Sequence, residues 1–219
     1  MDNFRLLSTK VLTPTQSKRL IQTGVNLYSW NFIEVSPISF SVNIKNQSLI
    51  FTSQNAVKAT LNHLSFTSKK CYCVGDKTKT LLEEMGQNVV KMAKNASDLV
   101  DFILKNVKNE TFVFFTGTHR IPEIEKKFNA QNRPLTVVET YTTFLTPKAV
   151  GKVEGILFFS PSGVASYLQK NDLMNSQCFV LGTTTAKALE PYTQSIIIAN
   201  KPTVEHLISS VRKYLNTLL

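Results

Sequence analysis

The chain has 219 residues, of which 42% are hydrophobic and 18% are charged, so it is long enough to bury a core without disulfides or a structural metal. It contains no run of about 18 consecutive apolar residues, which excludes a membrane-spanning helix. The formal net charge of +10 predicts an anionic partner, which on composition alone is nucleic acid, phosphate or a polycarboxylate.

The three cysteines, Cys71, Cys73 and Cys178, are too few for a disulfide framework, and two of them fall in predicted buried strands. This usage favours a reducing compartment. The amino terminus also lacks a secretory apolar segment with a cleavage site, so we expect a cytoplasmic protein. No matching ligand spacing accompanies the Cys-x-Cys pair, and no metal site is predicted.

Hydrophobic periodicity and capping residues predict strands and helices that alternate along the chain. At the amino terminus, strands at 4–8 and 32–35 flank a helix that opens at Thr13–Pro14 and stops at Gly24. The next strands are predicted at 49–51, 71–74, 88–91, 111–115 and 135–138. The helices among them are predicted at 56–64, 78–85, 98–105 with Ser97 as its cap, and 121–129.

The last third of the chain continues the alternation. Strands are predicted at 156–159, 178–181 and 195–198, and helices at 163–170, 185–192 and 203–218. Strands that alternate with helices through short loops are typical of parallel α/β sheets.

Two stretches of the chain repeat each other at a constant separation, as Ser53 and Ser160 show (160 − 53 = 107). The same separation relates Val57 and Val164, Leu61 and Leu168, Cys71 and Cys178, Gly75 and Gly182, Thr78 and Thr185, and Leu82 and Leu189. Because this register holds without a gap, we predict two copies of one structural unit. Each copy presents Ser and Thr at its strand-to-helix turns.

The second copy lacks two strands of the first, and the amino terminus supplies similar segments. FRLLSTK (4–10) resembles FVFFTGT (112–118), and FIEV (32–35) resembles VVET (137–140). We therefore predict two similar parallel-sheet α/β lobes. One lobe is continuous, at 36–138, and the other is discontinuous, at 1–33 plus 145–219. The chain would cross between the lobes at 34–37 and again at 139–147.

Ligands of open parallel sheets bind outside the carboxyl ends of the strands. The residues predicted there are Ser53, Thr78, Thr116, Gly117, Ser160, Ser162 and Thr185. Their hydroxyls, together with the free N–H groups of the helices that follow, favour anions. Simple helix capping is the alternative for each residue taken alone. Two such edges that face each other would form an interlobe cleft.

Two cations and one tyrosine complete the candidates. Lys10 and Arg120 occupy equivalent turns and would either pair with carboxylates or remain solvated surface charges. Tyr141 lies in the second crossing, where its phenol would donate a proton or orient a leaving group, unless it is only a strand residue. No nucleophile elbow, P-loop or dinucleotide motif is present.

Five segments together resemble the uroporphyrinogen-III synthase family over essentially the whole chain. They are LIFTSQNAV (49–57), VGDKT (74–78), ETYTT (139–143), FFSPSGV (158–164) and LGTTTAKAL (181–189). Each segment alone is a weak signal. Their order and spacing, above all FFSPSG followed by GTTTAKAL, are specific.

The resemblance implies two α/β lobes joined by a two-stranded linker. It implies a lyase of tetrapyrrole (haem) biosynthesis that cyclises hydroxymethylbilane to uroporphyrinogen III, with inversion of the terminal pyrrole ring and loss of water. No cofactor is implied. The substrate is a flexible linear tetrapyrrole with many carboxylates, which agrees with a basic chain and with anion-binding turns. We expect a monomer that binds neither nucleic acid nor membrane.

The resemblance also assigns roles to residues. Tyr141 matches the family tyrosine proposed to assist departure of the terminal hydroxyl. Ser160, Ser162 and Thr185 match substrate contacts of the discontinuous lobe, and Ser53, Thr78 and Gly117 match those of the other lobe. Thr118, Arg120, Gly163 and Lys10 complete the predicted substrate-binding set. Many members have Arg where this chain has Lys10, and a lysine meets a carboxylate only as a point charge.

Two other function classes stay open from the residues. A non-catalytic two-lobed module that binds a polyanionic small molecule would present the same edges. Nucleic-acid binding would follow from net charge alone, but the 25 Lys and Arg are scattered and form no basic run or recognisable motif.

Overall fold

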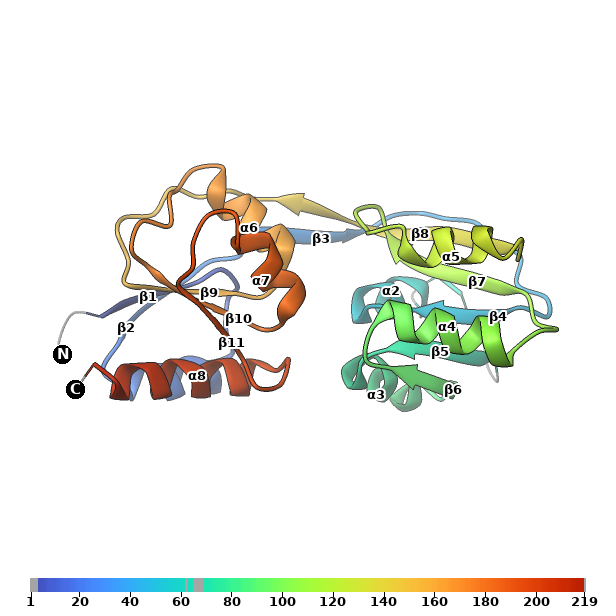
Figure 1. Cartoon of the computed structure of the whole chain (residues 1–219), viewed down its shortest axis with the longest axis horizontal. Helices are drawn as coiled ribbons and strands as arrows, with labels where there is room; N and C mark the ends of the chain where they lie inside the picture. The colour runs from blue at the N-terminus through green and yellow to red at the C-terminus, as the bar shows by residue number, and fades with distance from the viewer. Residues whose placement is uncertain (1–3, 62, 65–68, 219) are drawn as a thin grey trace. The chain divides into compact units, whose positions relative to one another are not determined.

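The computed structural model describes residues 4–61, 63–64 and 69–218. The chain folds into two compact units. Unit 1 consists of Met1–Glu34 and Phe144–Leu219, and unit 2 consists of Val35–Thr143. Each unit is a β-sheet covered by helices (Figure 1). No helix in the described part of the chain is long and apolar enough to cross a membrane.

The sheet of unit 1 has five strands in the order β11-β10-β9-β1-β2, and every neighbouring pair is parallel. Its strands are β1 (Arg5–Ser8), β2 (Asn26–Ser29), β9 (Gly155–Phe158), β10 (Gln177–Val180) and β11 (Ile196–Ile198). Strand β1 pairs with β9, so the amino-terminal segment lies inside a sheet that the end of the chain completes.

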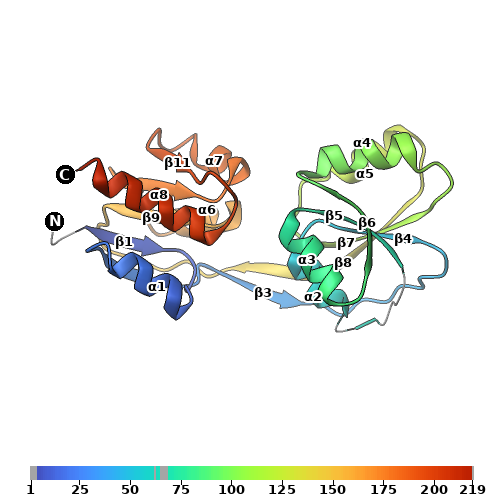
Figure 2. The same ribbon diagram turned by 90° about the horizontal axis from the view of Figure 1, so that it is seen from below.

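The helices of unit 1 cover both faces of this sheet (Figure 2). Helices α1 (Pro14–Ile21) and α8 (Val204–Asn216) pack on one face through Leu20, Leu207 and Val211. Helices α6 (Pro161–Leu168) and α7 (Thr183–Leu189) pack on the other. Both faces are buried, which is why the central strands are continuous apolar runs.

The sheet of unit 2 has the order β3-β8-β7-β4-β5-β6. Its strands are β3 (Ile33–Pro37), β4 (Ser48–Phe51), β5 (Lys70–Val74), β6 (Asn88–Ala93), β7 (Phe112–Gly117) and β8 (Leu135–Leu145). The pairs from β8 to β6 are parallel. Strand β8 is the longest of these strands and reaches past Thr143 into unit 1, while β3 also spans the boundary between the units.

Two layers of core enclose the sheet of unit 2. Helices α2 (Gln54–Leu61) and α3 (Asp76–Glu84) cover one face and, with Val57, Leu82 and Phe115, form the α2/α3 core. Helices α4 (Ala96–Asn106) and α5 (Glu123–Ala130) cover the other face and, with Ile103 and Phe128, form the α4/α5 core. Figure 2 shows the two helix pairs on opposite sides of the strands.

Local capping explains where several helices begin. Thr13 forms a reciprocal capping box with Gln16 at α1, and Ser160 and Thr203 accept backbone N–H groups at α6 and α8. The cap predicted at Ser97 is wrong. Helix α4 starts at Ala96, two residues before the predicted start at residue 98, and the side chain of Asn95 accepts the N–H of Asp98.

The segment around residues 26–37 also differs from the sequence prediction. We did not predict β2, which is short and half exposed and pairs with β1 at the edge of unit 1. The segment FIEV was expected to complete that sheet, but β3 is instead the neighbour of β8 in the sheet of unit 2. The helix predicted at 56–64 ends at Leu61, and Asn62 lies outside the described residues.

An ion pair joins the two chain segments of unit 1. Arg5 donates from Nη2 to Glu154 Oε1 at 2.6 Å and from Nε to Oε2 at 3.1 Å. The backbone N–H of Arg5 donates to the same carboxylate at 2.8 Å. The side-chain hydrogen bonds from Arg5 lower the pKa of Glu154 from 4.5 to about 2, more strongly than its partial burial raises it.

This pair predicts a specific acid sensitivity. The carboxyl has a lower pKa in the folded chain than in the unfolded chain, so its stabilisation is complete above pH 4.5 and is lost as the pH falls towards about 2. In Glu154→Gln, the free energy of unfolding should be lower at neutral pH and should fall less steeply between these pH values. Urea unfolding at a series of pH values measures both, with Glu190→Gln, a change at an exposed position, as the control. Equal slopes in wild type and Glu154→Gln would contradict the prediction.

Candidate functional site

The carboxyl ends of β4, β5 and β7 place Ser53, Thr78 and Gly117 at one edge of the sheet of unit 2. Ser53 lies just before α2, and its Oγ accepts the N–H of Ala56 at 3.1 Å. Thr78 lies in the first turn of α3 and is buried, with its backbone N–H bonded to Gly75 O at 3.2 Å. Gly75 has a φ of 83°, a conformation that favours glycine, and it lets the chain turn from β5 into α3.

Tyr141 on β8 lies against this same edge. Its phenol oxygen hydrogen-bonds with Ser53 Oγ at 3.1 Å. A Cβ placed on Gly117 would lie 2.6 Å from Tyr141 Cζ, far inside van der Waals contact. The ring therefore occupies the space that any side chain at position 117 would fill. Tyr141 is thus in direct contact with two other predicted residues, Ser53 and Gly117.

The turn after β7 is tied to β8 by further hydrogen bonds. The N–H of Thr118 donates to Tyr141 O at 3.0 Å, and Thr118 Oγ1 hydrogen-bonds with Thr142 Oγ1 at 2.9 Å. Thr118 Oγ1 also lies 3.0 Å from His119 Nδ1. These bonds tie the turn at Thr118 to β8 at Tyr141 and at the residue after it.

The guanidinium of Arg120 donates hydrogen bonds to other residues of unit 2. Its Nε donates to Glu125 at 2.6 Å, and its Nη1 donates to Glu139 at 2.7 Å and to Gly117 O at 3.2 Å. Burial alone would lower the pKa of Arg120, but the hydrogen bonds to the two carboxylates outweigh it and the pKa is raised. Arg120 therefore braces the turn that carries Gly117, and its predicted contact with substrate carboxylates stays a prediction.

The edge of unit 1 repeats this geometry. Ser160 Oγ accepts the N–H of Gly163 at 3.2 Å, the same bond that Ser53 makes with Ala56. Thr185 is buried like Thr78, and its N–H bonds to Gly182 O at 3.1 Å. Residues that are equivalent at the separation of 107 therefore make equivalent hydrogen bonds at the strand-to-helix turns. One difference is Gly182, whose φ of −169° is extended backbone.

The other predicted residues of unit 1 lie around Ser160. Ser162 is half-buried in the first turn of α6, and a Cβ on Gly163 would lie 3.5 Å from Thr9 Oγ1. Lys10 follows β1 with its side chain exposed. We did not predict Ser8 and Thr9, which are buried at the end of β1 and donate to the carbonyls of Lys10 and Leu157. The signal was present in the STK segment, where two hydroxyl residues follow an apolar strand.

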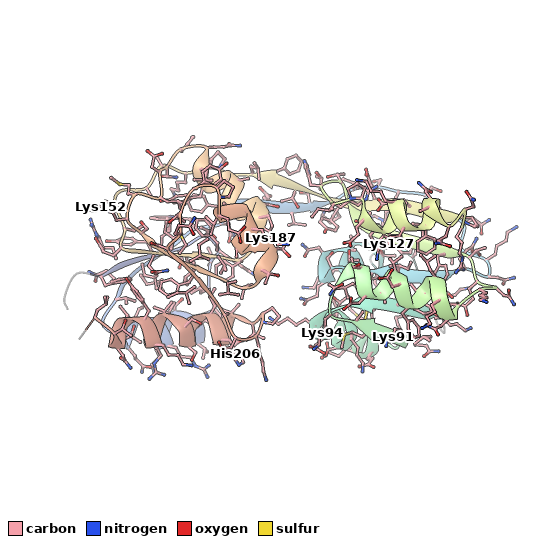
Figure 3. The ribbon with its side chains drawn as sticks, viewed as in Figure 1. Lys91, Lys94, Lys127, Lys152, Lys187 and His206 are labelled. Carbon is pink, nitrogen blue, oxygen red and sulfur yellow. The ribbon has the colours of Figure 1, made fainter. Side chains whose placement is uncertain are left out.

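Lysine side chains lie on both units, and some of them contact other groups of the same unit. Figure 3 labels Lys152 and Lys187 on unit 1 and Lys91, Lys94 and Lys127 on unit 2. Lys127 donates to Ser97 Oγ and to Asp101, both at 2.6 Å, and Lys91 lies 4.5 Å from the ring centre of Phe102. The Lys and Arg residues are therefore spread along the sequence and occur in both units.

The thiols take no part in these edges. Cys71, Cys73 and Cys178 are free and buried, and burial raises their pKa values to about 12, 11 and 12. They are core residues without nucleophilic character. Among the described residues, no group of three His, Cys, Asp or Glu side chains is placed to hold a metal ion.

The fold and its edges define a class: a protein of two parallel α/β units, each of which presents hydroxyls and helix amino termini where such sheets bind anionic small molecules. A family model described as uroporphyrinogen-III synthase HemD matches residues 15–209. The chain belongs to this family, whose members are cofactor-independent lyases of tetrapyrrole biosynthesis. A comparison with curated protein sequences gives no match.

Solved structures with the same fold carry the same description. Uroporphyrinogen-III synthetase from Helicobacter pylori is 15% identical with a TM-score of 0.70, over 96% of this chain and 99% of that chain. A mutant uroporphyrinogen III synthase from Thermus thermophilus is 12% identical with a TM-score of 0.70, over 98% of both chains. Another crystal form of the Thermus enzyme, the wild type, gives 11% identity and a TM-score of 0.52, over 98% and 99% of the two chains. At these identities the likeness shows the fold.

The contact between Gly117 and Tyr141 predicts the effect of one added methyl group. The backbone at Gly117 does not have a positive φ, so Gly117→Ala changes only the available space. The new Cβ should push the phenol away from Ser53 and lower kcat about tenfold or more, because small displacements of reacting groups are costly. Turnover of hydroxymethylbilane measures this. Gly151→Ala, which meets nothing within 4 Å, is the matched control. Equal kcat in the two variants would contradict a role for this contact.

Proposed function

We propose that this protein closes hydroxymethylbilane to uroporphyrinogen III, and that it does so with Tyr141 at the edge of unit 2. The observation that carries the proposal is the placement of this phenol, held between Ser53 and Gly117 at the carboxyl ends of the parallel strands. Membership of the family supplies the reaction class.

The two edges suit the substrate. A linear tetrapyrrole carries acetate and propionate carboxylates, and each edge offers hydroxyls beside the free N–H groups of helix amino termini, such as those of α2 and α6. We infer that Ser160, Ser162 and Thr185 bind carboxylates in unit 1 and that Thr78 and Thr118 do so in unit 2, whereas Ser53 contacts the substrate beside the phenol and donates its one hydroxyl proton to Tyr141. Lys10, exposed after β1, would add a positive charge.

The reaction requires the protein to position the substrate and to donate one proton. The C–O bond of the terminal hydroxymethyl group breaks as the lone pair of its pyrrole nitrogen moves towards the carbon, and the hydroxyl leaves as water after it takes a proton. The phenol of Tyr141 would donate that proton. The Ser53 hydroxyl would keep the phenol in place, since it is itself fixed by the N–H of Ala56. The new C–C bond then forms at a pyrrole carbon, whose displaced proton would restore the phenol, and ring closure depends on how the bound chain is folded.

The domain bounds predicted from sequence are part of the same proposal. We propose lobes at 1–33 plus 145–219 and at 36–138, with 34–37 and 139–147 as a two-stranded linker. The adjacency of β3 and β8 in one sheet and the change of unit after Glu34 and after Thr143 support it. The three free, buried thiols support a reducing compartment, and we propose the cytoplasm. A monomeric state stays a prediction.

The isomer of the product tests the function. Without enzyme, hydroxymethylbilane closes to the type I ring, whereas a uroporphyrinogen-III synthase gives the type III ring. We expect the wild-type protein to yield mainly type III when the oxidised products are separated by chromatography. A product that stays mainly type I would exclude the enzyme and favour a non-catalytic module that binds the polyanion.

Removal of one oxygen atom tests the role of Tyr141. In Tyr141→Phe, kcat should fall by about tenfold or more, because a lost general acid typically costs at least that much, while the fold is kept. Tyr192→Phe, the same change at an exposed position of unit 1, should keep the wild-type rate. A wild-type kcat in Tyr141→Phe would remove the phenol from the mechanism even if the type III ring is made.

A further inference from the structure

Strand β8 contains an irregularity immediately before Tyr141. The parallel pairing of β7 with β8 runs in register from Phe112 opposite Leu135 to Thr116 opposite Glu139. The next residue of β7, Gly117, then pairs with Tyr141. Thr140 is thus an extra residue on β8, a β-bulge, which is rare in parallel pairs.

This bulge decides which face of the sheet Tyr141 occupies. Side chains two residues apart in a regular strand share a face, and Leu135 and Val137 both pack on the α4/α5 core. Regular alternation would send Tyr141 to that face as well. Instead Tyr141 packs on the α2/α3 core, together with Val138. A slip of one residue moves a side chain to the opposite face, and here it brings the phenol to Ser53.

Thr140 is hydrogen-bonded both to β7 and to the segment that follows β3. Its side chain is fully buried, and its hydroxyl donates to the carbonyl of Thr116, the last residue of β7 in regular register, at 3.2 Å. Its own carbonyl accepts the N–H of Ile38 at 3.0 Å. The hydroxyl therefore supplies a bond from the extra residue back to the neighbouring strand at the point where the register shifts.

We propose that Thr140 is a positioning residue for the ring-closing reaction: its hydroxyl holds the bulge that places the Tyr141 phenol above Gly117 and beside Ser53. The inference rests on the proposed role of Tyr141 but makes a separate claim. A buried threonine with no contact to the substrate sets the geometry of the group that acts on it.

The kinetic test uses two substitutions of similar size. Thr140→Val replaces only the hydroxyl, with a methyl group, and we expect kcat to fall about tenfold or more with KM little changed, since displaced groups lose rate before binding. Thr140→Ser keeps the hydroxyl and should restore most of kcat. Thr136→Val, the same change at an exposed position in the regular part of β8, is the matched control and should behave as wild type.

A second readout separates positioning from stability. In the Tyr141→Phe background, Thr140→Val should cause no further loss of kcat, because the group that it positions is already absent. If Thr140 had a purely structural role, Thr140→Val would lower the thermal midpoint by a similar amount in both backgrounds. It would then lower the observed rate only by reducing the folded fraction. The kcat values are therefore referred to the folded fraction, measured by circular dichroism.

A third readout does not depend on activity. The Tyr141 ring lies over Gly117, so the α protons of Gly117 should carry a ring-current shift in NMR spectra of protein labelled at glycine. That shift should persist in Thr140→Ser and be lost in Thr140→Val.

A wild-type kcat in Thr140→Val, or an unchanged Gly117 shift in that variant, overturns the proposal. If the wild-type protein makes no type III product, the proposed function fails, and the Gly117 shift alone decides whether Thr140 positions Tyr141.

Discussion

The placement of Tyr141 depends on the absence of a side chain at Gly117. The phenol reaches Ser53 only because Gly117 has no Cβ, and a Cβ there would lie 2.6 Å from the ring. Around this contact the sheet supplies the rest: parallel strands end at one edge, helices begin there with free N–H groups, and the Thr140 bulge turns the tyrosine towards them. In the described part of unit 1, the turns at Ser160 and Thr185 repeat this edge, and no hydrogen bond joins either side chain to a tyrosine. This asymmetry agrees with the proposal that both edges bind carboxylates and that the edge of unit 2 donates the proton.

Much of this arrangement could be predicted from the sequence because it is local. The turns at Ser53 and Ser160 follow from an apolar strand, a hydroxyl residue and a helical pattern, and the repeat of 107 residues identified them as equivalent. Most of the predicted strands and helices are present, with ends that differ by a few residues. The family resemblance rested on these same turns, and the family match confirms it.

What could not be predicted depends on contacts between distant residues. The bond from Tyr141 to Ser53 joins residues 88 apart in the sequence, and no periodicity marks it. The extra residue in β8 is invisible in ETYTT, because a bulge is a relation between two strands. Arg120 was predicted either to pair with substrate carboxylates or to remain a solvated surface charge, and only the fold shows its ion pairs with Glu125 and Glu139. Strand β2 was missed because a short, half-exposed edge strand lacks a clear apolar pattern.

The central claim is that Tyr141 occupies the α2/α3 face of its sheet, above Gly117. The nuclear Overhauser effects of the Tyr141 ring protons measure this directly. The structure predicts strong effects to the α protons of Gly117 and effects to the β protons of Ser53, whose hydroxyl lies 3.1 Å from the phenol oxygen. A missing Gly117 effect, with effects instead to Glu139, which lies two residues away on the face of Val137, would mean that β8 alternates regularly. That result would contradict the bulge, the placement of the phenol and the mechanism built on it.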